Sequence, residues 1–382
     1  MKKPVYLDYH STTPCDAAVI DAMMPCFGGG FGNPGAKSHA HGRSAARQLE
    51  QALEKIGALI GAGPECITLT SGATESNNLA LLGLAERATD RKEIVITAIE
   101  HNCVFNTAAY LATKGFIVKD VPVTAEGLVD PAELKKRVTP KTLVVSVIAA
   151  SHEIGTIQPL KECAQIAHDA GALFHTDATQ ALGKIALDVN DLGIDLLSYS
   201  AHKLYGPVGI GALYVRQKPP VPISRVFFGG AQQSLRPGSV PLALSVGFAT
   251  ACELAAQGRA THIPRIEKMT ALLLAELQAR IPALKLNGGG SRLPGLLNIR
   301  LPDISAQDIM LELADDVCMS TGAACSSANR KPSSVLKAIG LSDNDIDCSL
   351  RLTLGRGSTA EEMTYAAAKL AEGVERLSRR AA

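Results

Sequence analysis

Lys203 has the sequence surroundings of a lysine that reacts with a carbonyl group. It lies in Ser-Tyr-Ser-Ala-His-Lys-Leu-Tyr-Gly-Pro (residues 198–207), directly after a strand-like run and before a Gly-Pro turn. An amine held at the edge of a sheet and partly removed from water is deprotonated more easily, and only the neutral amine is a nucleophile. A solvated loop lysine has the same local sequence, so this motif alone favours neither role.

Asp177 supplies the second part of the same chemistry. It comes directly after the strand-like run 173–176, so we expect it at the carboxyl end of a strand, where ligands of open α/β sheets bind. A buried aspartate needs a cationic partner, and a protonated pyridine nitrogen is one. Such a pair, together with a Schiff-base lysine, is the pattern of pyridoxal-phosphate enzymes. On its own, Asp177 could equally be a helix N-cap.

The segment Thr-Ser-Gly-Ala-Thr-Glu-Ser (residues 70–76) predicts a phosphate site. It follows a strand-like run and opens a helical one, and its small residues let backbone N–H groups face a phosphate. Ala73 and Thr74 are the candidates, and an ordinary helix cap is the alternative. By contrast, residues 30–35 match G-x-G-x-x-G only literally, because the preceding residues 19–26 are helical in pattern and Pro34 interrupts the turn.

The nine cysteines are scattered and include no C-x-x-C pair. This distribution argues against a disulfide framework and indicates a reducing, cytoplasmic location. Cys325 differs from the others because it lies in a Gly/Ser-rich stretch, residues 320–328. An accessible thiol on a polar loop can act as a nucleophile, whereas most lone cysteines are small buried hydrophobic residues.

The middle of the chain alternates strand-like and helical patterns. Strands are predicted at residues 67–70, 93–99, 143–149, 173–176, 196–200 and 210–215, and helices at 75–88, 102–114 and 160–170. This alternation predicts an α/β fold with a mostly parallel central sheet. After residue 260 the pattern changes to amphipathic helices around a strand-like run at 296–301. We therefore predict a large domain over residues 15–260 and a smaller α+β domain formed by residues 1–14 and 261–382.

The bulk composition excludes several classes of protein. The net charge of +1 gives no reason to expect direct binding to nucleic acid or to a membrane surface, and no run of 18 apolar residues predicts a membrane span. His10, His39 and His41 have no carboxylate or cysteine that would complete a ligand set, so we expect no metal.

Together these segments resemble the cysteine desulfurases. They form part of the class V group of fold-type-I pyridoxal-phosphate enzymes, and the resemblance is to the bacterial housekeeping and nitrogen-fixation type. The matching segments occur in order at residues 6–14, 31–34, 70–76, 100–101, 153–155, 177–180, 202–203, 325 and 350–356, over nearly the whole chain.

The resemblance implies a homodimer that binds pyridoxal 5'-phosphate. Lys203 would hold the cofactor and later move the Cα proton, and Asp177 would keep the pyridine nitrogen protonated. His101 would stack on the ring and relay protons, and Gln180 would bond the ring hydroxyl. The phosphate would be held by Ala73, Thr74, Ser200 and His202, and by Ser239 of the other subunit.

The resemblance also implies the substrate and the reaction. Arg351, helped by Asn33, would bind the carboxylate of L-cysteine. Cys325 would take the sulfur as a persulfide and leave L-alanine. The sulfur would then pass to an acceptor protein for iron–sulfur clusters, thio-cofactors or nucleic-acid thiolation. His152 stands near the substrate where the family usually has Asn, and a titratable ring there changes the site's response to pH.

Three alternatives remain at this point. The chain could be another class V enzyme, such as a selenocysteine lyase or a transaminase, but a transaminase has no need of Cys325. It could be a non-catalytic scaffold of the same fold, which would be expected to lose Lys203, Asp177 or Cys325, and all three are present. It could also be a dedicated desulfurase, such as that of DNA phosphorothioation.

Overall fold

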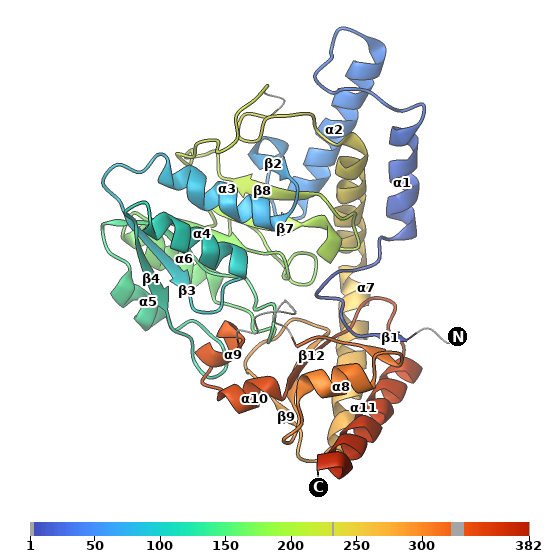
Figure 1. Ribbon diagram of the computed structural model, residues 1–382. Coiled ribbons are helices and arrows are strands. Elements are labelled where there is room, and N and C mark those ends of the chain that lie inside the picture. Colours follow the sequence, from blue (N-terminus) through green and yellow to red (C-terminus); the bar gives the residue numbers. More distant parts are fainter. Residues whose placement is uncertain (1–3, 231–232, 322–331, 382) are drawn as a thin grey trace.

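The computed structural model describes residues 4–230, 233–321 and 332–381. Its larger part is built on a seven-stranded sheet in the order β2-β8-β7-β6-β5-β3-β4 (Figure 1). The strands are β2 (Ile67–Thr70), β3 (Glu93–Thr97), β4 (Ile117–Val121), β5 (Thr142–Ser146), β6 (Leu173–Asp177), β7 (Leu196–Ser200) and β8 (Gly211–Val215). β8 runs antiparallel to both of its neighbours, β2 and β7, and all other pairs are parallel. The mostly parallel sheet predicted from the sequence is confirmed.

Helices cover both faces of this sheet, so most of its strands are apolar along their whole length. Along β3 and β5 the side chains alternate between two apolar clusters: Val95 and Val145 belong to one, and Ile94 and Val144 to the other. The first cluster is closed by α2 (Ala40–Ala58), α5 (Pro131–Arg137), α6 (Leu160–Asp169) and the start of α7 (Leu242–Arg280). The second is closed by α3 (Ala73–Ala85) and α4 (Asn102–Ala112).

The smaller part lies below the large sheet in Figure 1 and is built on a three-stranded antiparallel sheet. Its elements are β9 (Lys285–Leu286), β10 (Leu296–Arg300), α8 (Ala306–Glu312), β11 (Val317–Cys318), α9 (Ser334–Ala338), α10 (Asp343–Asp347), β12 (Ser349–Thr353) and α11 (Ala360–Ala381). The N-terminal strand β1 (Val5–Tyr6) pairs in parallel with β11, so the start of the chain joins this part. The remaining elements are α1 (Ala17–Phe27) and the short turns η1 (Pro64–Cys66) and η2 (Ala201–Lys203).

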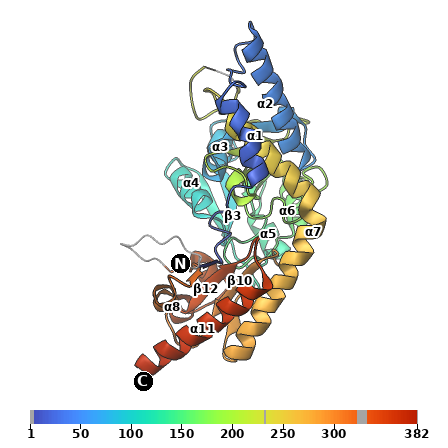
Figure 2. The same cartoon turned by 90° about the vertical axis from the view of Figure 1, so that its right-hand side faces the viewer.

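Helix α7 connects the two parts and runs along both of them (Figure 2). Its first half, with Phe248 and Cys252, packs in the large apolar cluster, and its second half, with Leu273 and Leu277, packs in the core of the small part. The expected boundary at residue 260 therefore falls inside a continuous helix, and the division into domains stays a prediction. Among the described residues, none of the helices is both long and apolar enough to cross a bilayer.

Candidate active site

The predicted chemical residues gather at one edge of the large sheet. Asp177 and Ser200 are the last residues of β6 and β7, and Lys203 closes the turn η2 after β7. His101 follows β3 as the N-cap of α4. Because β3, β6 and β7 run in the same direction, their carboxyl ends meet at this edge, where open α/β sheets bind ligands.

Asp177 is 3% exposed, and its two side-chain oxygens accept hydrogen bonds from neutral donors. One carboxylate oxygen accepts from the side-chain amide of Asn77 at 2.7 Å, and the other accepts from the backbone N–H of Thr179 at 2.9 Å. Neither donor carries a charge, and a buried carboxylate is stabilised further by a cation. The site therefore favours a positively charged ligand group beside Asp177.

Lys203 points toward the N-terminal segment. Its Nζ donates to the carbonyl oxygens of His10, at 2.5 Å, and Ser11, at 2.6 Å. Burial, reinforced by the charge of Arg351, lowers the pKa of Lys203 to about 8. At that pKa roughly a tenth of the amine is neutral at pH 7, so the lysine is suited to attack a carbonyl carbon.

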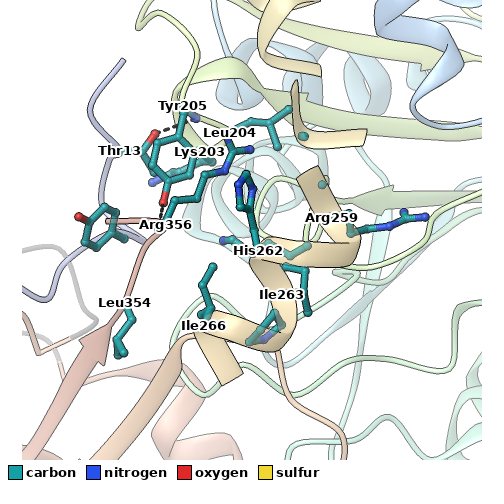
Figure 3. Close-up of a pocket in the computed structure, with 15 residues that line it drawn as sticks. Thr13, Lys203, Leu204, Tyr205, Arg259, His262, Ile263, Ile266, Leu354 and Arg356 are labelled. Carbon is teal, nitrogen blue, oxygen red and sulfur yellow. Dashed lines mark hydrogen bonds between the residues drawn. The ribbon is translucent and has the colours of Figure 1, made fainter. Parts of the chain in front are cut away.

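The turn that carries Lys203 borders a pocket at the junction of the two parts (Figure 3). Residues that line this pocket hold the turn in place. Tyr205 has a φ of 61°, which is uncommon for a residue with a side chain. Its backbone N–H donates to Oγ1 of Thr13 at 2.8 Å, and its hydroxyl accepts from the backbone N–H of Arg356 at 2.6 Å. The Arg356 guanidinium also lies 4.3 Å from the tyrosine ring centroid. These contacts hold the turn in place.

Two histidines face each other next to these groups. The rings of His101 and His152 meet edge to face with their centroids 5.3 Å apart. Nδ1 of His101 accepts from the backbone N–H of Cys103 at 3.2 Å and so caps helix α4. Burial, followed by the charge of His152, lowers the pKa of His101. The surroundings of His101 therefore favour the neutral imidazole.

The start of α3 is suited to an anion. Its N-cap is Gly72, which has a φ of 154° and makes no side-chain cap. A Cβ placed on Gly72 would lie 3.7 Å from Oγ of Ser200, so the two segments meet. Ala73 and Thr74 form the first turn of this helix. His202 bonds Thr12 through Nδ1 at 3.1 Å, and burial with the charge of Lys203 lowers its pKa to about 4.

Gln180 forms a hydrogen-bonded group with His10 and Lys184, and Lys184 was not predicted from the sequence. Its Nε2 donates to the carbonyl oxygen of His10 at 2.9 Å, and its Oε1 accepts from Nζ of Lys184 at 3.2 Å. Lys184 also lies 3.1 Å from Nε2 of His10, and burial lowers its pKa to about 7. Lys184 thus fixes the orientation of the Gln180 amide. The signal in the sequence is its position four residues after Gln180.

Arg351 lies in β12 of the small part and reaches the same edge. Its guanidinium donates to the backbone oxygen of His152 at 3.0 Å, to Asp8 at 3.0 Å and to Ser11 at 2.9 Å. Its Nε is buried and has no hydrogen-bond partner among the described residues. The arginine is therefore placed to receive an anion that competes with Asp8.

One expected residue, Asn33, lies away from this group within one chain. Asn33 lies in the exposed loop between α1 and α2, which Figure 1 shows at the end of the molecule opposite the small part that carries Arg351. Its Oδ1 accepts from the N–H of Gly35 in its own turn. Ser239 is exposed, and its neighbour Arg236 pairs with Glu75 in the first turn of α3 at 2.9 Å. Within one chain Asn33 and Arg351 therefore lie apart, and the expectation that Asn33 assists Arg351 stays a prediction.

Cys325 lies outside the described residues, but the described residues on both sides of it contact the site. Ser320 pairs with Arg351 through backbone hydrogen bonds in both directions, at 2.7 and 3.4 Å. On the other side, the Ser333 hydroxyl donates to Glu153, next to His152, at 2.6 Å. The chain therefore leaves and rejoins the described structure beside the two substrate-site candidates Arg351 and His152.

Comparison with known proteins gives full-length similarity. The family described as "Aminotransferase class-V" matches residues 5–365. The chain is 42% identical over 378 residues to the cysteine desulfurase of Mus musculus, which covers 98% of this chain and 82% of that protein. A solved NifS-like protein superposes with a TM-score of 0.90 at 33% identity and covers 98% of this chain and 99% of its own. The structure "SspA in complex with cysteine" has a TM-score of 0.79 at 32% identity, with 92% and 98% of the two chains covered.

Proposed function

Since the chain belongs to the class V aminotransferase family and, within it, to the cysteine desulfurases, we propose that it converts L-cysteine to L-alanine and transfers the sulfur to Cys325. The observation that carries this proposal is the anchoring of Ser320 and Ser333. Both ends of the segment that contains Cys325 start from the candidate substrate site. Cys325 is five residues from Ser320, and a chain of that length extends up to roughly 18 Å.

Pyridoxal phosphate is the cofactor of this family, and the donors in the site fit it. Asp177 offers a buried carboxylate without a charged donor, which suits a protonated pyridine nitrogen. Lys203 offers an amine that is partly neutral at pH 7. Gln180 would bond the ring hydroxyl, His101 would lie against the ring, and Ala73, Thr74, Ser200, His202 and the partner subunit's Ser239 would hold the phosphate.

When bound, this cofactor supplies a ring that withdraws electrons and weakens the bonds at the substrate's Cα. The side chains of this chain do the rest. Arg351 binds the substrate carboxylate with its fork of donors, after releasing Asp8. Lys203 takes the Cα proton on Nζ and returns it. His152 lines the carboxylate end of the site, where its ring meets His101.

The sulfur transfer balances without an added oxidant. The carbon–sulfur bond of L-cysteine breaks while a sulfur–sulfur bond forms to Sγ of Cys325. The products are L-alanine and a persulfide on the protein, and together they contain the atoms of cysteine and of one thiol. The nucleophile is the Cys325 thiolate, because thiols react with sulfur only when deprotonated. A sulfur-acceptor protein then removes the outer sulfur.

A homodimer accounts for the exposed apolar surface. Ile20, Met24 and Phe27 lie on one stripe of α1 and are exposed, and Phe228 is 85% exposed just before the loop that carries Ser239. An exposed apolar stripe such as the one on α1 is typical of an interaction site. A second copy that covers these side chains would also bring Ser239 and Asn33 to the partner's site. The eight cysteines of the described part are unpaired, which suits the cytoplasm.

The proposal is tested by incubating the purified protein with L-cysteine and pyridoxal phosphate. We expect alanine and sulfide in equal amounts when a reductant releases the persulfide sulfur. L-Selenocysteine and an amino-group acceptor, tested in parallel, cover the other class V reactions. If alanine forms from selenocysteine but not from cysteine, the protein is a selenocysteine lyase. If the amino group passes to a keto acid, it is a transaminase. Either result contradicts the desulfurase assignment.

A further inference from the structure

Cys103 connects two groups that lie on different sides of the proposed cofactor site. Its Sγ lies 3.0 Å from Nδ1 of His101 and 3.1 Å from the amide nitrogen of Asn77. The same Asn77 nitrogen donates to Asp177 at 2.7 Å. His101, Cys103 and Asn77 therefore form a continuous chain of polar contacts that ends on Asp177. Cys103 and Asn77 are 8% and 0% exposed, so water does not compete for these bonds.

The direction of each hydrogen bond follows from the donors available. The carboxylate of Asp177 can only accept, so the nitrogen of the Asn77 amide must face it. One amide hydrogen goes to Asp177 and the other to Sγ of Cys103. The sulfur therefore accepts from Asn77, which leaves the thiol hydrogen to point at Nδ1 of His101. The backbone N–H of Cys103 donates to the same nitrogen at 3.2 Å.

Two donors that converge on Nδ1 leave no room for a proton there. We propose that Cys103 is a positioning residue that holds His101 as the neutral tautomer with its proton on Nε2. His101 then presents its Nε2–H to the site as a hydrogen-bond donor. This inference rests on the proposed function only in placing the cofactor ring beside His101.

The surroundings of His101 support this state. The N-terminus of α4 disfavours a positive charge on its own N-cap. The charged or titratable groups that act on His101 are His152 and Lys203, which oppose its protonation, and Asp177 and Glu153, which favour it. Burial, with the charge of Asp177, raises the pKa of Cys103 to about 12, so the thiol keeps the hydrogen that it donates. A thiol in this state is not a nucleophile, which separates Cys103 from the role proposed for Cys325.

The test is the protonation pattern of His101 in the full-length, cofactor-loaded protein. Histidine labelled with ¹⁵N distinguishes a protonated from an unprotonated ring nitrogen, and His101→Gln identifies the signals. We expect Nδ1 of the wild type to be unprotonated between pH 6 and 8. Cys103→Ser, which can still donate and accept, should keep this pattern. Cys103→Ala should give a mixture of tautomers and let His101 protonate at a higher pH.

Cys163→Ala is the matched control, because Cys163 is also a buried thiol, on α6 in another part of the core. It should leave the His101 signals unchanged. We also expect Cys103→Ala to lower kcat/KM about fivefold, as for loss of one ordinary hydrogen bond, and Cys103→Ser to stay within about twofold. Protonation of Nδ1 in the wild type, or identical spectra for Cys103→Ala and the wild type, would overturn the proposal. The NMR experiment reads the tautomer without turnover, so it tests only the role of Cys103. The alanine assay tests the desulfurase assignment separately.

Discussion

Nζ of Lys203 lies 2.5 Å from the carbonyl oxygen of His10, although the two residues are 193 positions apart in the sequence. The N-terminal segment that supplies this carbonyl also supplies Asp8 and Ser11, which bond Arg351. The lysine of the large part and the arginine of the small part therefore contact one short segment. Residues 8–11 therefore fix the position of the Lys203 amine relative to the Arg351 guanidinium.

Lys203→Ala should remove the covalent attachment of the cofactor and leave a folded protein. The alanine has no amine, whereas the surrounding core does not depend on Nζ. Borohydride reduction followed by peptide mass mapping locates the attachment, and circular dichroism checks folding. Lys184→Met is the matched control, since Lys184 is the second partly buried lysine beside His10, and it should keep the adduct on Lys203. A wild-type adduct that maps to any other lysine contradicts the assignment.

Arg351→Gln and Arg351→Lys should separate two effects of this arginine. The charge of Arg351 contributes to the low pKa of Lys203, so Gln should raise that pKa and leave less neutral amine at pH 7. We expect cofactor attachment to the cofactor-free protein to slow about threefold or more at pH 7, and little at pH 10. Lys keeps the charge and the attachment rate but loses the fork, so both variants should bind cysteine weakly. If Arg351→Gln attaches the cofactor as fast as the wild type at every pH, the charge of Arg351 does not act on the pKa of Lys203.

His152→Asn should change the response of the site to pH. The charge of His152 lowers the pKa of His101, so removing the imidazole should raise it. The Michaelis constant for cysteine should also lose part of its pH dependence, because Asn does not titrate. Both are measured on the same protein, by histidine NMR and by kinetics between pH 5.5 and 8.5. Unchanged results in both would mean that His152 does not act on the substrate site.

Glu100→Gln should change how stability depends on pH. Burial raises the pKa of Glu100 to about 8 from 4.5. Between these two values the folded protein holds a proton that the unfolded chain has released, so stability falls as pH rises through this window. Gln is neutral throughout and can still accept from Thr97 and from the N–H of Ile148. The variant should therefore gain more stability at pH 8 than at pH 5.

Urea unfolding midpoints at pH 5, 6.5 and 8 measure this difference. The exposed Glu50→Gln on α2 is the control and should follow the wild type at all three values. If Glu100→Gln loses stability equally at every pH, the buried carboxylate is charged in the folded protein and the expected linkage is absent.

The strands that carry the site could be predicted because they are short apolar runs buried on both faces. β2 and β7 match their predicted limits, and β5, β6 and β8 lie within a few residues of theirs. β4 was missed because Ile117–Val121 includes Lys119 and Asp120, and only Val121 is buried. The length of α7 was missed because its apolar face changes partner along the helix and it contains Pro264.

Site residues could be predicted where they lie in a recognisable local motif. They could not be predicted where their role depends only on a contact with a residue distant in the sequence. Lys203 and Asp177 follow strands and have characteristic neighbours, so the sheet edge could be named in advance. Asn77 follows the motif of residues 70–76 and Lys184 lies four residues after Gln180, but neither position indicates a distant partner. Asn77 meets Asp177 across 100 positions, and Lys184 meets His10 across 174. Such pairings depend on the tertiary fold, which the local pattern does not specify.

The most direct test of the account is to follow the sulfur of labelled L-cysteine in the wild type, Cys325→Ser and Cys15→Ser. Cys15 is a partly exposed free thiol outside the proposed site and serves as the control. In the wild type and in Cys15→Ser, we expect the label on Cys325 as a persulfide, with alanine released. Cys325→Ser should still bind cofactor and cysteine, because those steps use Lys203, Asp177 and Arg351, but its alanine production should fall to near background. Near wild-type alanine production by Cys325→Ser, or a persulfide on another of the nine cysteines, would contradict the central claim.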